Sequence, residues 1–244
     1  MPALASGPET ATWISIADGV ETRRFDADDY GVSVIAWRLD ETRVRMGLRA
    51  AASAKGETAR EMRQAGGALL AINGGFFDLD IRERLTPAGL FVVDGRKRRG
   101  FDAEKAKNPL SGILFSRDGR VGIMWARDYR DTDQFDFAVQ TGPLIVDPGG
   151  VNGIYRNSFD RQNRSAVCID RAGRPVIVAV SGGLSLHELG RLLSQNEAEG
   201  GLGCERAINL DGGPSTQVSV GAKGAELELP GIWKVASALL VTGR

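Results

Sequence analysis

A carboxylate followed by two glycines ends a short apolar run in the stretch 207–217, Ala-Ile-Asn-Leu-Asp-Gly-Gly-Pro-Ser-Thr-Gln. The apolar residues 207–210 predict a buried strand, and Asp211 stands where that strand ends. Gly212 and Gly213 permit a tight turn and leave backbone amides free to approach a ligand. Because successive amides form a concave site for anions, this turn could hold a polar or anionic substrate beside Asp211. The alternative is an ordinary strand–turn–strand hairpin.

The stretch 71–78, Ala-Ile-Asn-Gly-Gly-Phe-Phe-Asp, has the same layout of an apolar strand, an asparagine, a glycine pair and a carboxylate. Each copy also follows a predicted helix and a glycine-rich break. The likeness suggests a weak internal repeat that places two polar turns at one end of one sheet. We therefore expect the polar residues of both turns to contribute to one site.

The chain of 244 residues is long enough to bury one sizeable core, and no linker divides it. We expect residues 1–11 to be a disordered lead or processing remnant and residues 12–244 to form one domain. Lysine plus arginine and aspartate plus glutamate are equal in number, which argues against nucleic acid or an anionic membrane as the main partner. The sequence contains no apolar run that could span a bilayer and no visible signal peptide, and it does not indicate an oligomeric state.

Few residues are available for tight metal binding or for a histidine-based triad. The single histidine, His187, begins a predicted helix and is expected on its surface. Neither a phosphate-binding loop nor a dinucleotide fingerprint is present. We expect Cys168 and Cys204, the only cysteines, to be buried free thiols, with a disulfide as the alternative.

Hydrophobic alternation and turn signals predict a β-rich chain. The predicted strands include residues 32–39, 44–48 and 86–94, and the predicted hairpins include 111–126 and 164–180. Two main helices are expected, over residues 57–64 and from a capping box at Ser185 to about residue 197. The basic run 96–99 (Arg-Lys-Arg-Arg) is expected to be a solvated loop; a functional role for it would be to attract an anionic substrate. The fold class is therefore α+β (mixed α/β), a β-rich single domain with a central twisted sheet.

Four motifs in this order resemble the phosphodiester glycosidase family. They are Asn73-Gly-Gly-Phe-Phe77, Thr141-Gly-Pro-Leu144, Arg164-Ser-Ala166 and Leu210-Asp-Gly-Gly-Pro-Ser215. The resemblance runs from about Trp13 to the C-terminus. The family resembles the enzyme that uncovers mannose 6-phosphate by removing N-acetylglucosamine from a phosphodiester, and its bacterial members are often linked to exopolysaccharide. The resemblance implies an extracytoplasmic protein, periplasmic or secreted.

This sequence departs from the family pattern in two places. The family often has a third glycine and paired serines where this chain has Pro214, Ser215 and Thr216, and often a glycine where Cys168 stands. Proline stiffens the turn and is expected to alter substrate choice. The cysteine is expected to be a packing change.

The resemblance implies a hydrolase that cleaves the glycosidic C–O bond of a sugar-1-phosphodiester and releases the sugar and a phosphomonoester. Because a phosphomonoester is a good leaving group, a carboxylate that steadies the sugar cation or activates water matters more than a strong acid. Asp211 is the first candidate for this carboxylate and Asp78 the second, while the planar guanidinium of Arg164 suits phosphate oxygens. The expected substrate-binding residues are Asn73, Gly74, Gly75, Thr141, Gly142, Asn209, Gly212, Gly213, Ser215 and Thr216.

Two alternatives remain open at this point. The same polar turns would serve a non-catalytic module that binds a glycan or envelope polysaccharide. A cation-dependent phosphodiesterase would cut the P–O bond instead. No cofactor is required by the sequence, but Asp78, Asp211 and backbone carbonyls could together hold a divalent cation such as calcium.

Overall fold

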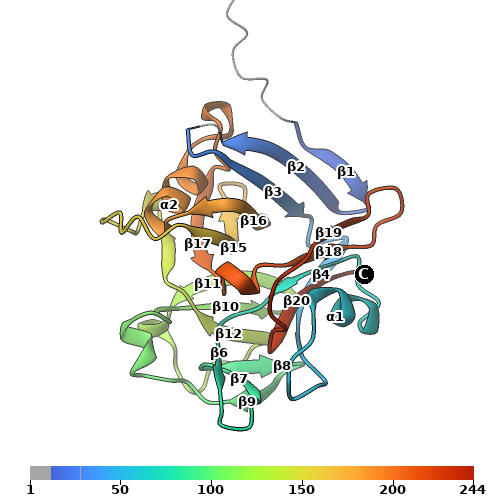
Figure 1. The fold of residues 1–244 in the computed structure, drawn as a ribbon, viewed down its shortest axis with the longest axis vertical. Helices are drawn as coiled ribbons and strands as arrows, with labels where there is room; N and C mark the ends of the chain where they lie inside the picture. The colour runs from blue at the N-terminus through green and yellow to red at the C-terminus, as the bar shows by residue number, and fades with distance from the viewer. Residues whose placement is uncertain (1–11, 28) are drawn as a thin grey trace, which may run out of the picture.

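The computed structural model describes residues 12–27 and 29–244 and shows a β-rich molecule with two α-helices (Figure 1). The predicted mixed α+β class is confirmed. A single central twisted sheet is not confirmed, because the strands are divided among several sheets. The predicted lead, residues 1–11, lies outside the described residues, and the domain boundary at residue 12 stays a prediction. No helix in the described part of the chain is long and apolar enough to cross a bilayer.

The strands have the following bounds. They are β1 (Ile14–Ala17), β2 (Val20–Ala27), β3 (Val32–Leu39), β4 (Val44–Ala50), β5 (Leu70–Asn73), β6 (Phe77–Leu79), β7 (Leu85–Pro87), β8 (Phe91–Val93), β9 (Arg96–Arg99), β10 (Gly112–Arg117), β11 (Arg120–Trp125), β12 (Phe137–Thr141), β13 (Leu144–Asp147), β14 (Val151–Asn152), β15 (Gln162–Asp170), β16 (Pro175–Leu184), β17 (Cys204–Asn209), β18 (Val218–Val220), β19 (Leu227–Leu229) and β20 (Ser237–Gly243). The α-helices are α1 (Ala59–Ala65) and α2 (Leu186–Ser194).

Three larger sheets and one ribbon are built from these strands. The eight-stranded sheet has the order β1-β2-β3-β16-β15-β17-β13-β14, and the two five-stranded sheets have the orders β11-β10-β12-β8-β9 and β19-β18-β5-β20-β4. Strands β6 and β7 form a separate ribbon. Every strand pairing within the described residues is antiparallel.

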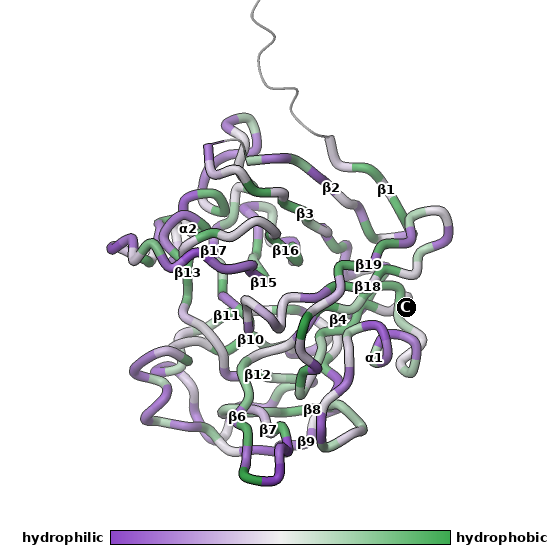
Figure 2. The backbone as a smooth tube through the Cα atoms, in the orientation of Figure 1, coloured by the Kyte–Doolittle hydropathy of each residue, from purple (hydrophilic) through white to green (hydrophobic). Residues whose placement is uncertain are grey.

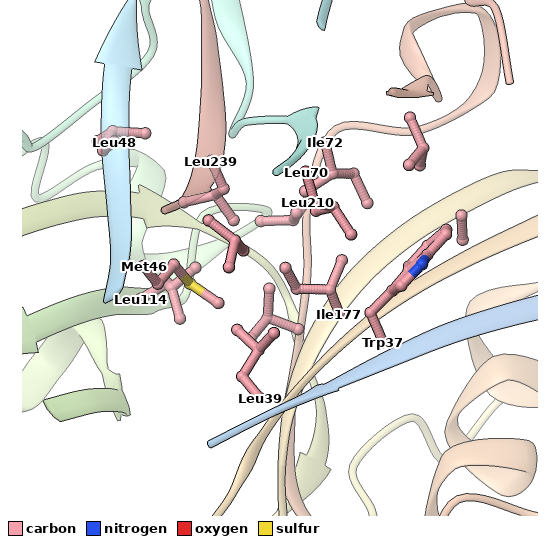
Figure 3. Close-up of a cluster of buried hydrophobic side chains, with 14 of the residues drawn as sticks. Trp37, Leu39, Met46, Leu48, Leu70, Ile72, Leu114, Ile177, Leu210 and Leu239 are labelled. Carbon is pink, nitrogen blue, oxygen red and sulfur yellow. The ribbon is translucent and has the colours of Figure 1, made fainter. Parts of the chain in front are cut away.

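The main core lies where the three larger sheets face one another (Figure 3). It combines Trp37 of β3 and Ile177 of β16 with Leu114 of β10 and with Ile72 and Leu239 of the third sheet. Burial of such large apolar side chains is the dominant favourable term in folding. Figure 2 shows hydrophobic residues along many strands and hydrophilic residues in many of the connecting loops.

Both predicted helices are present and begin where their capping residues require. In α2, Ser185 accepts a hydrogen bond from the amide of Glu188 while the Glu188 carboxylate accepts one from the amide of Ser185. Thr58 and Glu61 form the same reciprocal cap on α1. Each cap satisfies amides that the first helical turn leaves unpaired, so the helices start one residue after the cap. Helix α2 ends at Ser194, three residues before the predicted end, and residues Glu197–Glu199 form a separate 3₁₀ turn.

The predictions for residues 86–99 were wrong in two respects. The expected single strand 86–94 is divided between β7 and β8, and the basic run expected to be a loop forms β9. Asp94 and Gly95 both have positive φ, at 50° and 71°. Two consecutive residues with positive φ form the tight turn that suits a two-residue hairpin, so Asp94-Gly95 joins β8 to β9.

The cysteines form a disulfide, which corrects the expectation of free thiols. Cys168 of β15 and Cys204 of β17 are fully buried, with their Cα atoms 5.8 Å apart. Their strands are neighbours, since Cys168 is opposite Ala207 and Cys204 is opposite Asp170. The sequence does not reveal this register, which is why the pairing could not be predicted. The bond ties together the two strands that carry Arg164 and the Asp211 turn.

Candidate active site

The two glycine-pair turns meet, although they leave different sheets. Gly74 follows β5 in a five-stranded sheet, and Asp211 follows β17 in the eight-stranded sheet. The amide of Asp211 donates to the carbonyl of Gly74 (3.2 Å), and Asn73 Nδ2 donates to the carbonyl of Asp211 (2.6 Å). The expectation that both turns lie at one end of one sheet was therefore wrong. Their contact instead forms a junction between two sheets, which we call the seam: residues 73–75, 141–142, 164–165 and 209–217.

Asn73 is the centre of the seam. Its side chain is fully buried, and Oδ1 accepts hydrogen bonds from the Ser165 hydroxyl (2.7 Å) and the Gln217 amide (3.3 Å). Nδ2 donates to the carbonyls of Asp211 and Gly74. These bonds fix which way the amide group points, and they join β5, β15 and the turn after β17. Asn73 therefore positions the seam backbone rather than presenting its own amide to a ligand.

Ser165 and Gln217 are seam residues that the sequence-based site did not include. Ser165 is fully buried and follows Arg164 in the Arg-Ser-Ala motif. Gln217 Nε2 donates to the carbonyl of Ser215 (3.2 Å), and its Oε1 accepts from the amide of Ala59 (2.7 Å). The available signal was the placement of polar residues in otherwise apolar strands, where burial requires a hydrogen-bond partner.

Asp211 combines burial with local hydrogen bonds. Burial raises the pKa of its carboxyl to about 6, although the Ser215 hydroxyl and the Gly212 amide act in the opposite direction. The Gly212 amide donates to Oδ1 at 2.9 Å. A carboxyl group that changes its charge near neutral pH is a candidate for acid–base or electrostatic chemistry.

Arg164 lies beneath the Asp211 turn and is nearly buried. Nε donates to the carbonyl of Leu184 and Nη2 to the carbonyl of Asp160, both at 2.7 Å. A side chain added at Gly212 would place its Cβ 3.9 Å from Nη1. Burial lowers the pKa of Arg164 from its ordinary value, partly offset by the Asp160 carboxylate. Since two of its nitrogens bind carbonyls, Nη1 on the Gly212 side is the part of the guanidinium nearest to the turn.

A third sheet reaches the seam through the end of β12. Thr141 Oγ1 donates to the carbonyl of Asn209 (3.0 Å), and Asn209 Nδ2 donates to the carbonyl of Gly142 (3.0 Å). Gly75 packs against this strand so closely that an added Cβ would lie 2.8 Å from Val139 Cγ2. Among the described residues, Asn209 Oδ1 and Thr216 Oγ1 are shielded from solvent without a hydrogen-bond partner.

Asp78 has different surroundings from Asp211. It lies on β6, where Lys105 Nζ donates to both carboxylate oxygens (2.8 and 2.9 Å) and Arg99 Nη2 donates to Oδ2 (2.9 Å). Partial burial raises the pKa of Asp78, but the bonds and charges of Lys105 and Arg99 outweigh it and hold the pKa below its ordinary value. Within residues 12–27 and 29–244, no hydrogen bond joins Asp78 to the Asp211 turn.

The predicted calcium site stays a prediction. Both oxygens of Asp78 are engaged by cations, which leaves Asp211 as the free carboxylate of the proposed pair. In the described part of the chain, no group of three or more His, Cys, Asp or Glu residues is arranged to hold a metal ion. Backbone carbonyls and Thr216 Oγ1 would have to supply the other oxygen ligands.

An exposed aromatic residue stands beside the site. The amides of Ile232 and Trp233 donate to the carbonyl of Pro214 (2.8 and 3.1 Å), which fixes their loop against the Asp211 turn. Trp233 is 57% exposed, so its ring offers apolar surface next to the polar turn. Nothing in the sequence places this loop at the site, because its proximity depends on backbone contacts between distant segments.

The fold and the seam together define a class: a β-rich domain in which two glycine-pair turns meet beside a half-buried carboxyl group. Residues 66–242 match the model of the family described as phosphodiester glycosidase. The chain belongs to the phosphodiester glycosidase family, as the four sequence motifs indicated.

Two proteins that resemble this chain are distant in sequence. The chain is 23% identical over 157 residues to the uncharacterized protein YigE of Escherichia coli (strain K12), a match that covers 62% of this chain and 58% of that protein. The catalytic domain of zebrafish N-acetylglucosamine-1-phosphodiester alpha-N-acetylglucosaminidase, auto-inhibited by its pro-peptide, has a TM-score of 0.68 at 19% identity. That likeness covers 96% of this chain and 87% of the zebrafish chain.

A hypothetical protein from Synechocystis also has a similar structure. Its TM-score is 0.66 at 17% identity, over 98% of this chain and 65% of that chain. At these identities, the two solved structures establish a shared fold.

Proposed function

We propose that this protein hydrolyses the glycosidic C–O bond of a sugar-1-phosphodiester, releasing the sugar and a phosphomonoester. The observation that carries the proposal is the half-buried carboxyl of Asp211, whose pKa is raised to about 6, beside the glycine-pair turn of a phosphodiester glycosidase. Family membership supplies the reaction class, and the zebrafish neighbour acts on N-acetylglucosamine-1-phosphodiester according to its name.

In this proposal, ionised Asp211 stabilises positive charge on the sugar or activates the attacking water. The phosphomonoester leaves with the electron pair of the C–O bond, so its departure needs no strong acid. The amides of Gly75 and Gly213 donate to phosphate or sugar oxygens, and Arg164 Nη1 adds positive charge beneath them. Gly74 and Gly212 shape the two turns, because their amides donate to the Ser237 carbonyl and to Asp211 Oδ1. Thr141, Gly142, Asn209, Ser215 and Thr216 hold the turns or contact the substrate.

Asp78 is the second candidate carboxylate. Its ion pairs keep it ionised at neutral pH, which suits electrostatic stabilisation and opposes a role as proton donor. Trp233 provides a flat apolar surface for a sugar ring or for the group beyond the phosphate.

The proposal includes an extracytoplasmic location, periplasmic or secreted. Its support is the buried Cys168–Cys204 disulfide, because such bonds persist in oxidising compartments and are rare in reducing ones. A sugar-phosphodiester or glycan substrate, including an exopolysaccharide, suits that location.

The test is turnover of a panel of sugar-1-phosphodiesters in ¹⁸O-water by the protein and by its Asp211→Asn variant. We expect ¹⁸O in the released sugar and loss of about 100-fold or more in kcat for the variant. Label in the phosphate would instead establish P–O cleavage by a phosphodiesterase. Saturable binding without turnover would establish a glycan-binding module.

Arg164→Lys tests the second part of the proposal. Lysine keeps the charge but cannot make the forked contacts with Leu184, Asp160 and a phosphate together. We expect a higher KM for the phosphodiester with the fold retained. An unchanged KM would remove Arg164 from phosphate binding.

A further inference from the structure

A large cavity lies away from the seam. It measures about 1020 Å³ and opens between strand β4 and the β8–β9 hairpin. Its lining contains four arginines (Arg45, Arg49, Arg98 and Arg99) but a single carboxylate, Asp94. Lysine plus arginine equal aspartate plus glutamate over the whole chain, so this excess of positive charge is local. No residue of the seam lines this cavity.

Strand β4 places two of the arginines on one open face. Side chains alternate along a strand, so Arg45, Gly47 and Arg49 share the face opposite the buried Met46 and Leu48. A Cβ added at Gly47 would meet nothing within 4 Å. The face is therefore open directly above the backbone of Gly47.

The other two arginines come from β9, across the cavity. Phe91 pairs with Arg99 and Val92 pairs with Lys97, which leaves Arg98 as the extra residue of a β-bulge. Bulges redirect a side chain out of the regular alternation, and Arg98 lines the cavity. Arg99 also lines it while binding Asp78.

These arginines are available for a ligand. Of the four, Arg99 alone forms a salt bridge within residues 12–27 and 29–244. Arg49 Nε is shielded from solvent and has no hydrogen-bond partner among the described residues. Guanidinium groups that converge from two walls of a cavity are suited to bidentate binding of phosphate or carboxylate.

A second cavity gives the matched comparison. It measures about 750 Å³, and its lining includes Lys97 and Arg117 together with three aspartates, Asp118, Asp133 and Asp136. Lys97 pairs with Asp131, and Arg117 pairs with Asp133. Charge in that cavity is compensated, so the uncompensated arginines distinguish the cavity beside β4.

We propose that the cavity between β4 and the β8–β9 hairpin binds a multiply anionic organic ligand, through phosphate or carboxylate groups, independently of the seam. Its volume is at the upper end of the roughly 300–1,000 Å³ typical of small-molecule sites, so one phosphate would not fill it. Leu85, Pro87 and Val93 add partly exposed apolar surface to the lining, which suits an organic body carrying the charges. An anionic oligosaccharide has this chemistry.

The test is titration calorimetry with two probes, inorganic pyrophosphate and trigalacturonate, which separate phosphate from carboxylate as the recognised group. The double variant Arg45→Gln/Arg98→Gln removes charge from both walls. Because a hydrogen bond to a charged group changes affinity by about tenfold or more, we expect Kd for the bound probe to rise about 100-fold. Both side chains are exposed, so the variant should fold normally.

Three further variants distinguish binding inside this cavity from nonspecific electrostatic attraction to the protein surface. Gly47→Leu fills the open face without changing charge and should abolish binding, with an unchanged circular dichroism spectrum as the folding check. Arg24→Gln removes an exposed arginine of β2 outside the cavity and should leave Kd unchanged. Asp211→Asn should also leave it unchanged, because the seam does not line the cavity.

Four results would overturn the proposal. The first two are a Kd above about 1 mM for both probes, which is weak binding, and an equal loss of affinity in Arg24→Gln. The other two are full binding by Gly47→Leu and loss of pyrophosphate binding in Asp211→Asn, which would place the anion in the seam. These outcomes do not bear on the proposed hydrolysis, because all of these measurements are of binding and none is of turnover.

Discussion

At the scale of single residues, Asp211 and Asp78 show how surroundings set the charge of a carboxyl group. Burial raises the pKa of Asp211 to about 6, whereas Lys105 and Arg99 hold the pKa of Asp78 below its ordinary value despite partial burial. Asp78 is therefore ionised across the neutral pH range. Asp211 changes charge at about pH 6, close to that range. The two residues are expected to respond oppositely to substitution.

The first prediction concerns the pH dependence of the proposed reaction. If ionised Asp211 is the active form, kcat/KM should fall as pH drops through about 6, because protonation removes its charge. A pH–rate profile with a confirmed substrate measures this. A limb near the ordinary carboxyl value of about 4 would contradict it, and a loss of activity above pH 6 would make Asp211 a proton donor.

The second prediction is that Asp211→Asn stabilises the protein. The pKa of Asp211 in the folded protein, about 6, exceeds the ordinary value of 3.8. The folded state therefore loses stability as pH rises from 3.8 to about 6, and above pH 6 this loss does not increase further. The neutral amide avoids this loss, so the free energy of unfolding above pH 7 should rise by up to about 3 kcal/mol, the equivalent of a shift of about two units. Near pH 3.8 the two proteins should differ little.

Urea denaturation at both pH values makes the measurement, and Asp78→Asn is the matched control. Because the pKa of Asp78 is lowered, its stabilising effect is present at neutral pH and disappears on acidification. The control should therefore destabilise at neutral pH. If Asp211→Asn instead destabilised the protein at neutral pH, burial of the ionised Asp211 carboxylate would not cost the folded state stability.

At the scale of elements, the seam depends on one side chain that joins three of them. Asn73 ends β5, bonds Ser165 of β15 and holds the turn after β17. Asn73→Ala would leave several buried partners unsatisfied, so unfolding free energy should fall by about 2–4 kcal/mol. Chemical denaturation tests this, with Asn196→Ala as an exposed control. A loss similar to that of the control would mean that the seam is solvated.

The disulfide is the second device at this scale. It joins β15 to β17 across a sequence separation of 36 residues. In the loop-entropy model such a link contributes about 4 kcal/mol, so the Cys168→Ala/Cys204→Ala variant should lose about that amount in denaturant unfolding. Wild-type protein in strong reductant should approach the same stability. If oxidised and reduced wild-type protein were equally stable, the disulfide would not contribute to the free energy of unfolding.

Local patterns predicted individual elements well. Residues 32–39 form β3 as expected, because the run is rich in apolar residues that a strand can bury. Val34 on one face and Trp37 on the other pack into different core clusters. The capping box at Ser185 placed the start of α2 correctly. The prediction for the basic run 96–99 was wrong, because charged side chains on an exposed edge strand look the same in sequence as a solvated loop.

At the scale of the whole molecule, the order of the motifs predicted the family, but their meeting point was beyond sequence reasoning. Asn73 and Asp211 were chosen for similar local patterns, whereas their contact depends on the docking of two sheets. The ion pairs of Asp78 likewise depend on Lys105 and Arg99, which no local motif links to it. The four-arginine cavity has the same origin, because its walls lie far apart in the chain.

Strand β20 lies between β5 and β4, although both of those strands are made much earlier. On the ribosome, the nascent sheet therefore keeps open edges until Ser237–Gly243 has emerged, and the Gly74 amide waits for the carbonyl of Ser237. Such edges invite pairing with other chains, so the growing polypeptide should rely on chaperones. Ribosome-arrested chains ending at Gly224 should remain protease-sensitive, and resistance acquired at that length would show that the β4–β5 region folds without its central strand.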